Sequence, residues 1–172
     1  MRNSRAKSVR WFKELLGIMQ ESGPVRIDSF HGKLFLLAYD PKTKDKLPYY
    51  DIFPLVFPVE VESDGFLGIN LHYLDPRLRK ELFDSLILFG ISAGAGEQIY
   101  LNFRYKHFNS FVARPLVEVC LKKYLFSHIH SWTNIRPTEW ENVVEMPLQS
   151  FQKRTSSSVW RTSRRKMNHN GQ

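Results

Sequence analysis

The hydrophobic and polar positions of the chain predict a small antiparallel sheet between residues 32 and 74. Three apolar runs rich in β-prone residues, 34–39, 55–61 and 66–74, are separated by polar loops that contain Asp, Lys, Gly and Pro. The last loop, Glu62-Ser63-Asp64-Gly65, has a glycine where a tight turn needs a positive φ. Three short strands joined in this way are typical of a β-meander.

Residues 47–54, with the sequence LPYYDIFP, lie between the first two predicted strands. The prolines of this segment exclude a central strand position, because proline lacks the N–H that a strand pairs with. We therefore expect an ordered corner, packed by its aromatic side chains. Its structural turn motif consists of Pro48, Tyr49, Tyr50, Asp51 and Pro54.

Two roles are open to the tyrosines of this corner. Tyr49 and Tyr50 are suited to stacking on bases or on a partner, but aromatic residues beside prolines more often pack a turn, and we favour that structural role. Asp51 is expected to accept backbone N–H groups in the turn before Ile52, so Asp51→Ala should lower stability.

Helical spacing follows the meander. Asp75-Pro76 predicts a helix start, because Asp accepts from the first free N–H groups and proline is tolerated at the first helical position. The spacing of apolar residues extends this helix to about Phe89, with Arg79 among the polar residues off the apolar face, and the glycine-rich run 90–96 interrupts it. A phosphate-binding loop continues with Gly-Lys-Ser or Gly-Lys-Thr, and this run does not, so we interpret it as a connection.

Further helices are predicted nearer the two ends. One runs from Arg114 to Ile129, with Cys120 in its apolar stripe as a packing residue, and a short one runs over 136–145 and ends at Met146. An amphipathic helix is predicted over 4–19, and residues 99–111 fit a strand or a helix equally well. The predicted fold class is α+β: a small antiparallel β-meander packed with three to four helices, with basic N- and C-terminal arms.

The net charge of +8 is concentrated at the two ends of the 172-residue chain. Residues 1–13 carry five Lys and Arg and residues 146–172 carry six, with no acidic residue in either segment. Removing these eleven leaves 14 basic and 17 acidic residues for the body. We expect a basic amphipathic helical arm over 1–23, an α+β core domain over 24–150 and a basic C-terminal tail over 151–172. Such tails are often used to bind polyanions or acidic proteins.

Few residues suggest catalysis. His128 and His130 would not share a helical face, and a single cysteine gives neither a disulfide nor a zinc knuckle. We therefore expect no metal, no cofactor and no enzymatic activity. The weaker alternative is a metal-dependent nuclease, because clustered carboxylates hold Mg²⁺ and four lie near a predicted hairpin: Asp51, Glu60, Glu62 and Asp64. No apolar run approaches the length of a membrane span.

Several motifs in order along the chain carry a family resemblance. They are Asp40-Pro41-Lys42, Leu47-Pro48-Tyr49-Tyr50-Asp51, Phe53-Pro54-Leu55 and the run 65–73. Through them, and over roughly residues 2–161, the chain resembles a family of small virion proteins from contractile-tailed, T4-like bacteriophages and their cyanophage relatives, of the type labelled DNA end protectors. It departs from the family over 90–103, which is short and glycine-rich, and in the extended basic tail.

The resemblance implies a non-enzymatic structural protein of the virion that binds or shields the ends of the genome. It implies assembly in the host cytoplasm in multiple copies, with other virion proteins and double-stranded DNA as partners and no membrane contact. The alternative is an adaptor of the neck, tail or baseplate whose arms bind neighbouring subunits. In either case the expected contacts come from basic residues of the two arms: Arg2, Arg5, Lys7, Arg10, Lys153, Arg154, Arg161, Arg164, Arg165 and Lys166.

Overall fold

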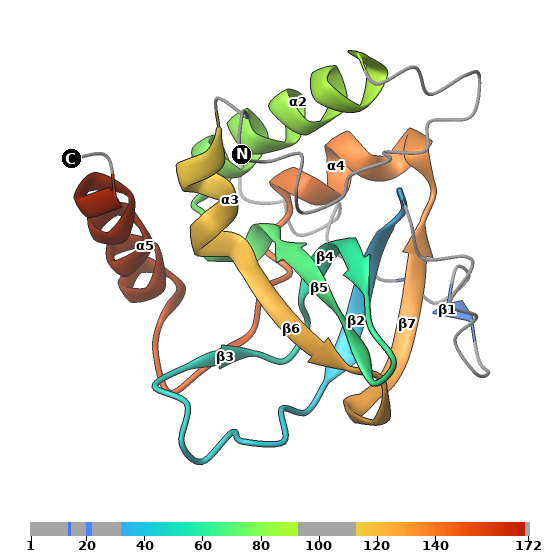
Figure 1. The fold of residues 1–172 in the computed structure, drawn as a ribbon, viewed down its shortest axis with the longest axis vertical. Helices are drawn as coiled ribbons and strands as arrows, with labels where there is room; N and C mark the ends of the chain where they lie inside the picture. Colours follow the sequence, from blue (N-terminus) through green and yellow to red (C-terminus); the bar gives the residue numbers. More distant parts are fainter. Residues whose placement is uncertain (1–13, 15–19, 22–31, 93–112, 171–172) are drawn as a thin grey trace.

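The computed structural model describes residues 14, 20–21, 32–92 and 113–170, which form a six-stranded antiparallel sheet, a separate two-stranded ladder and several helices (Figure 1). The strand order in the large sheet is β1-β7-β2-β4-β5-β6, and β3 pairs with β8. The strands are β1 (Gln20–Glu21), β2 (Leu34–Tyr39), β3 (Tyr50–Asp51), β4 (Leu55–Val61), β5 (Gly65–Asn70), β6 (Leu121–Leu125), β7 (Ile129–Ile135) and β8 (Phe151–Gln152).

The helices lie mainly over one face of the large sheet, as Figure 1 shows for α2, α3 and α4. They are α2 (Pro76–Ser92), α3 (Arg114–Cys120), α4 (Trp140–Glu145) and α5 (Ser156–Asn170), with 3₁₀ turns η2 (Leu71–Tyr73), η4 (Phe126–His128) and η5 (Pro137–Glu139). The α+β fold class is thereby confirmed. No helix in the described ranges has the length and apolar character to span a membrane.

The predicted meander is confirmed, because β2, β4 and β5 are consecutive neighbours in the sheet. Side chains alternate between two apolar clusters: Leu34 and Leu55 face the helices, and Phe35 and Val56 belong to a second cluster. The third strand ends at Asn70, earlier than predicted, because the Asn70 side chain accepts from His72 N–H at 3.0 Å and starts η2.

Gly65 is required for a reason that differs from the prediction. Gly65 does not have a positive φ; among the described glycines only Gly32 does, at 71°. A Cβ on Gly65 would lie 2.0 Å from the carbonyl oxygen of Tyr124 on the neighbouring strand β6. The close approach of β5 and β6 therefore excludes any side chain at this position.

The predicted start of α2 is confirmed. The Asp75 carboxylate oxygen Oδ1 accepts from the N–H groups of Arg77 at 3.1 Å and Leu78 at 3.2 Å. The helix continues to Ser92, so Gly90 does not end it. Arg79 was predicted on the polar side, but its side chain is fully buried and donates to the carbonyl oxygens of Leu74, Val144 and Met146.

The helix predicted from Arg114 to Ile129 is wrong beyond Cys120. The chain leaves the helical conformation at Leu121, with φ −70° and ψ 122°, and continues as strand β6. This strand pairs with β5, for example Tyr124 with Phe66, and so supplies hydrogen-bond partners to an edge that would otherwise be open. Cys120 is buried in the core, as predicted.

The short predicted helix near residue 140 is confirmed as η5 followed by α4, which ends at Met146. Its Trp140 is buried and donates its indole N–H to the carbonyl oxygen of Ile135 at 2.8 Å. The predicted N-terminal helix, apart from Glu14, and the ambiguous segment 99–111 lie outside the described residues.

Candidate nucleic-acid interface

Helix α5 carries most of the predicted C-terminal contact residues, and its apolar side holds it against the domain. Val159 and Ser163 are buried and Met167 is half-buried, so positions four residues apart form one packed face against α3 and η2. The helix begins where Thr155 Oγ1 accepts from Ser158 N–H at 3.3 Å. The basic tail is therefore a helix attached to its own domain.

The outward side of α5 is strongly basic. The helix contains Arg161, Arg164, Arg165 and Lys166 and no acidic residue, and all four side chains are exposed. Among the described residues, no carboxylate pairs with Arg161, Arg165 or Lys166. Arg161 and Arg165 lie on the side of the helix opposite the buried Val159 and Ser163, whereas Lys166 lies at the edge of a cleft beside the domain.

Arg164 has a different role from its neighbours. Its guanidinium pairs with the Asp75 carboxylate, with Nε at 3.1 Å from Oδ2, and Asp75 is also the N-cap of α2. Burial raises the pKa of Asp75, but the Arg164 hydrogen bond and the backbone N–H groups together hold it below its ordinary value. Arg164 therefore fixes α5 to the start of α2.

The two basic residues before α5 hold the turn that leads into the helix. The Lys153 ammonium donates to the carbonyl oxygens of Lys44 at 2.6 Å, Asp45 at 3.1 Å and Leu47 at 2.8 Å. The Arg154 guanidinium lies 5.2 Å from the centre of the Tyr49 ring. Lys153 is thus engaged within the domain, whereas Arg154 remains exposed beside the basic face of α5.

Asp51 ties the LPYYD corner to the rest of the domain. Its Oδ1 accepts from Phe53 N–H at 3.1 Å and Ser150 N–H at 2.9 Å, and its Oδ2 lies 2.7 Å from Nδ1 of His72. Burial raises the pKa of Asp51, but His72 and the two N–H groups outweigh that effect and lower it. An ionised Asp51 therefore accepts from the Nδ1–H tautomer of a neutral His72, whose pKa burial lowers.

The two tyrosines of the corner have different surroundings. The Tyr49 ring packs against Tyr73 at 6.0 Å and Phe151 at 6.4 Å between centroids. Tyr50 is half-buried and lines a cleft between the corner, β6 and α5, and its ring is not paired with another aromatic ring in the described residues. Both tyrosines line the cleft; Tyr49 is held there by two aromatic neighbours, whereas the Tyr50 ring has the Lys153 ammonium 6.0 Å from its centre.

The carboxylates considered for a nuclease do not converge. Glu62 and Asp64 pair with Lys123 at 2.6 and 3.2 Å, Glu60 is exposed, and Asp51 is bound to His72. In the part of the chain that the structure describes, no group of three or more His, Cys, Asp or Glu side chains is placed to hold a metal ion.

A family model described as the phage T4 terminal DNA protecting protein matches residues 2–166. The chain belongs to this family. The resemblance carried by the LPYYD corner and the 65–73 run is thereby confirmed. Searches of curated proteins and of solved structures find no match. Membership of the terminal DNA protecting protein family implies a protein associated with the phage virion.

The match covers α5 as far as Lys166 and so includes all four of its Arg and Lys residues. Four of the predicted contact residues lie outside the described residues, namely Arg2, Arg5, Lys7 and Arg10. The sequence did contain a signal for α5 that its low apolar content concealed: Val159, Ser163 and Met167 recur at intervals of four, with basic residues between them.

Proposed function

We propose that this terminal DNA protecting protein binds the ends of the packaged genome and shields them, with the basic face of α5 contacting the phosphate backbone. The observation that carries the proposal is a helix held on its own domain, with Arg161 and Arg165 turned outward, Lys166 exposed beside the cleft, and none of the three paired with a carboxylate within the described residues. Cations placed in this way bind DNA phosphates favourably, because binding releases counterions from the DNA.

The N-terminal cations extend the same interface in this proposal. Arg2, Arg5, Lys7 and Arg10 belong to a segment with no acidic residue before Glu14, and they add sequence-independent attraction to DNA. Arg154, next to α5, contributes in the same way. Lys153 and Arg164 serve the interface indirectly, because one holds the 44–47 turn and the other holds α5 on Asp75.

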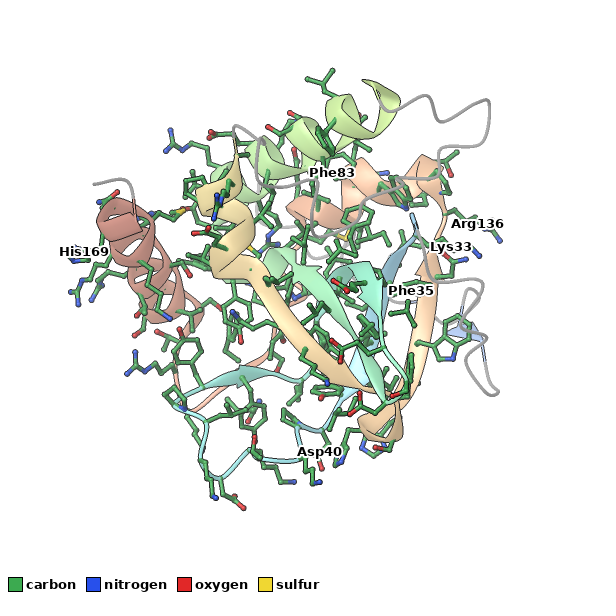
Figure 2. All side chains as sticks on the ribbon, viewed as in Figure 1. Lys33, Phe35, Asp40, Phe83, Arg136 and His169 are labelled. Carbon is green, nitrogen blue, oxygen red and sulfur yellow. The ribbon has the colours of Figure 1, made fainter. Side chains whose placement is uncertain are left out.

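The test compares two variants that each lose two positive charges. Arg161→Ala/Arg165→Ala removes the outward face of α5, and Lys33→Ala/Arg136→Ala removes two cations from the opposite side of the sheet, where Figure 2 labels them. Each lost phosphate contact lowers the slope of log K against log salt by about 0.9, so the α5 variant should lose about 1.8 of that slope. The control variant should keep it.

Protection is measured in the same samples as survival of a linear duplex exposed to an exonuclease that digests from free ends. We expect wild-type and control proteins to protect the duplex and the α5 variant to protect it poorly. A wild-type protein that leaves linear DNA as sensitive as naked DNA would refute the proposed function. An α5 variant that protects DNA fully but blocks particle assembly would assign the basic face to acidic virion subunits.

A further inference from the structure

A cleft of about 490 Å³ lies between the LPYYD corner, strand β6 and helix α5. Figure 1 shows where β3 of the corner, β6 and α5 lie, and β6 is an edge strand of the large sheet among the described residues. Its walls come from the 41–50 segment, from Tyr73 and Tyr124, and from Ser163 and Lys166 of α5. The volume falls within the range of about 300–1,000 Å³ that is usual for small-ligand sites.

The charge of the cleft is positive and largely uncompensated. Four lysines line it, Lys42, Lys122, Lys123 and Lys166, against a single acidic residue, Asp51. The Asp51 carboxylate is used by His72 and two backbone N–H groups, and Lys123 is used by Glu62 and Asp64. The other three lysines have no carboxylate partner in the described residues, so the cleft is suited to an anion.

Lys122 is the cation best placed to meet that anion. Its ammonium donates to the carbonyl oxygens of Val119 at 2.9 Å and Leu121 at 3.2 Å and lies 4.3 Å from the centre of the Tyr73 ring. An ammonium has three N–H donors, so one remains for a ligand. The pKa of Lys122 is lowered to about 8, mainly because the side chain is buried and in part because Lys166 carries a positive charge nearby. A bound phosphate would favour its protonated form.

The aromatic wall adds a second requirement to the ligand. Tyr50 lines the cleft, and its ring has no aromatic partner in the described residues and lies 6.0 Å from the Lys153 ammonium, while Tyr49, which also lines the cleft, is held by Tyr73 and Phe151. A flat ring beside a group of ammonium ions is the combination that binds a nucleotide, because the base stacks on the ring and the phosphate meets the cations, whatever the base.

The position of the cleft favours a nucleotide at the end of a strand. The cleft is lined by α5 and by the 41–50 segment, and its volume of about 490 Å³ suits one nucleotide better than a base that is stacked on both faces within a duplex. A terminal nucleotide leaves the stack at the smallest cost, since it has one stacking neighbour. Lys166 belongs to both the cleft and α5, so a duplex on the basic face would bring its end to the cleft.

We propose that the cleft receives a single nucleotide at the end of a DNA strand, with its base on Tyr50 and its phosphate at Lys122, Lys166 and Lys42. This inference rests on the proposed function, because it assumes that α5 holds the adjoining duplex. It adds recognition of the strand end to a contact that would otherwise hold any stretch of DNA.

The experiment measures affinity of the full chain for three duplexes of equal length: one with a single-nucleotide overhang, one blunt, and one closed at both ends by hairpins. Wild-type protein should bind the overhang duplex about tenfold more tightly than the closed one, as one stacked base supplies. Tyr50→Ala should abolish this preference and leave binding to the closed duplex unchanged, and Tyr50→Phe should keep it. The preference should also weaken as the pH rises through about 8, where Lys122 loses its proton.

A second variant keeps the proposal testable if Tyr50→Ala fails to fold. Lys42→Ala/Lys166→Ala changes two exposed residues of the cleft and should reduce the preference, whereas Lys33→Ala/Arg136→Ala should not. If both cleft variants keep the preference, the cleft assignment is overturned while binding through α5 stands. If free thymidine monophosphate displaces the overhang duplex at equal concentration, the cleft is a site for free nucleotides and the strand-end assignment falls. Absence of binding to all three duplexes would instead refute the proposed function.

Discussion

The buried pair of Asp51 and His72 makes the free energy of unfolding depend on pH just below neutrality. The His72 side chain is fully buried, and its pKa is lowered from 6.5 because burial opposes the imidazolium more strongly than Asp51 favours it. In the unfolded chain the same imidazole titrates near 6.5. Between the two pKa values the unfolded chain binds a proton that the folded chain does not, so stability falls as the pH falls.

The magnitude follows from the linkage of one proton to unfolding. The slope of the free energy of unfolding against pH approaches about 1.4 kcal/mol per pH unit when the unfolded imidazole is protonated and the folded one is not. Integrated from pH 7.0 to 5.5, this slope lowers the free energy of unfolding by about 1.3 kcal/mol when the folded His72 stays neutral. The lowered pKa of Asp51 acts in the same direction, but its contribution is full above about pH 4 and is lost only below it.

The assay is urea unfolding at pH 7.0 and 5.5 of wild-type protein and the variants His72→Gln and Asp51→Asn. Wild type should lose about 1.3 kcal/mol more than His72→Gln across this interval, because the remaining histidines are common to both proteins. Asp51→Asn should be less stable at both pH values and keep the wild-type difference between them, since His72 remains buried and neutral. An equal pH difference in wild type and His72→Gln would refute the reasoning.

Three further changes test contacts that hold the fold. Arg79→Leu should cost about 3 kcal/mol in urea unfolding, because it removes the guanidinium donor from the buried carbonyl oxygens of Leu74 and Val144 and from that of Met146, which still accepts from Leu148 N–H. Gly65→Ala should cost about 2–3 kcal/mol in the same measurement, because its Cβ would meet the Tyr124 carbonyl oxygen; equal stability would contradict the close approach of β5 and β6. Asp75→Ala should cost about 1 kcal/mol from the lost cap and should raise hydrogen exchange of α5 amides, since Arg164 loses its partner.

Elements whose signals are local were predictable from the sequence. The three strands of the meander are apolar, β-prone runs between clear turns, and Asp75-Pro76 marks a helix start within two residues. The corner was predictable in kind, because its prolines disfavour a central strand, and it contributes only the two-residue β3 of a separate ladder, and because its Asp51 accepts backbone N–H groups. These features depend on neighbours in the chain, so the sequence contains the information that determines them.

Features that depend on distant segments were missed. Residues 121–125 continue the apolar spacing of α3, yet they form a strand because β5 offers an edge more than fifty residues earlier in the chain. The burial of Arg79 depends on the carbonyl oxygens of Val144 and Met146, which helical spacing around residue 79 does not reveal. Helix α5 was interpreted as a tail because the surface that buries Val159 belongs to the core domain.

The LPYYD corner and the basic helix are parts of one structural unit, and this determines how mutations at the corner should be interpreted. Asp51 accepts from Ser150 just before β8 and from His72, and the carbonyl oxygen of His72 accepts from the Trp160 indole of α5 at 2.9 Å. Loss of the Asp51 carboxylate would therefore loosen the attachment of α5 as well as the corner. Because Asp51 is buried, a loss of DNA binding in Asp51→Ala would report a displaced helix, and it should be accompanied by lower stability. Loss of binding in Tyr50→Ala at unchanged stability would instead report a direct contact in the cleft. Variants of these two neighbouring residues therefore distinguish a residue that holds the interface in place, Asp51, from one that contacts the DNA, Tyr50.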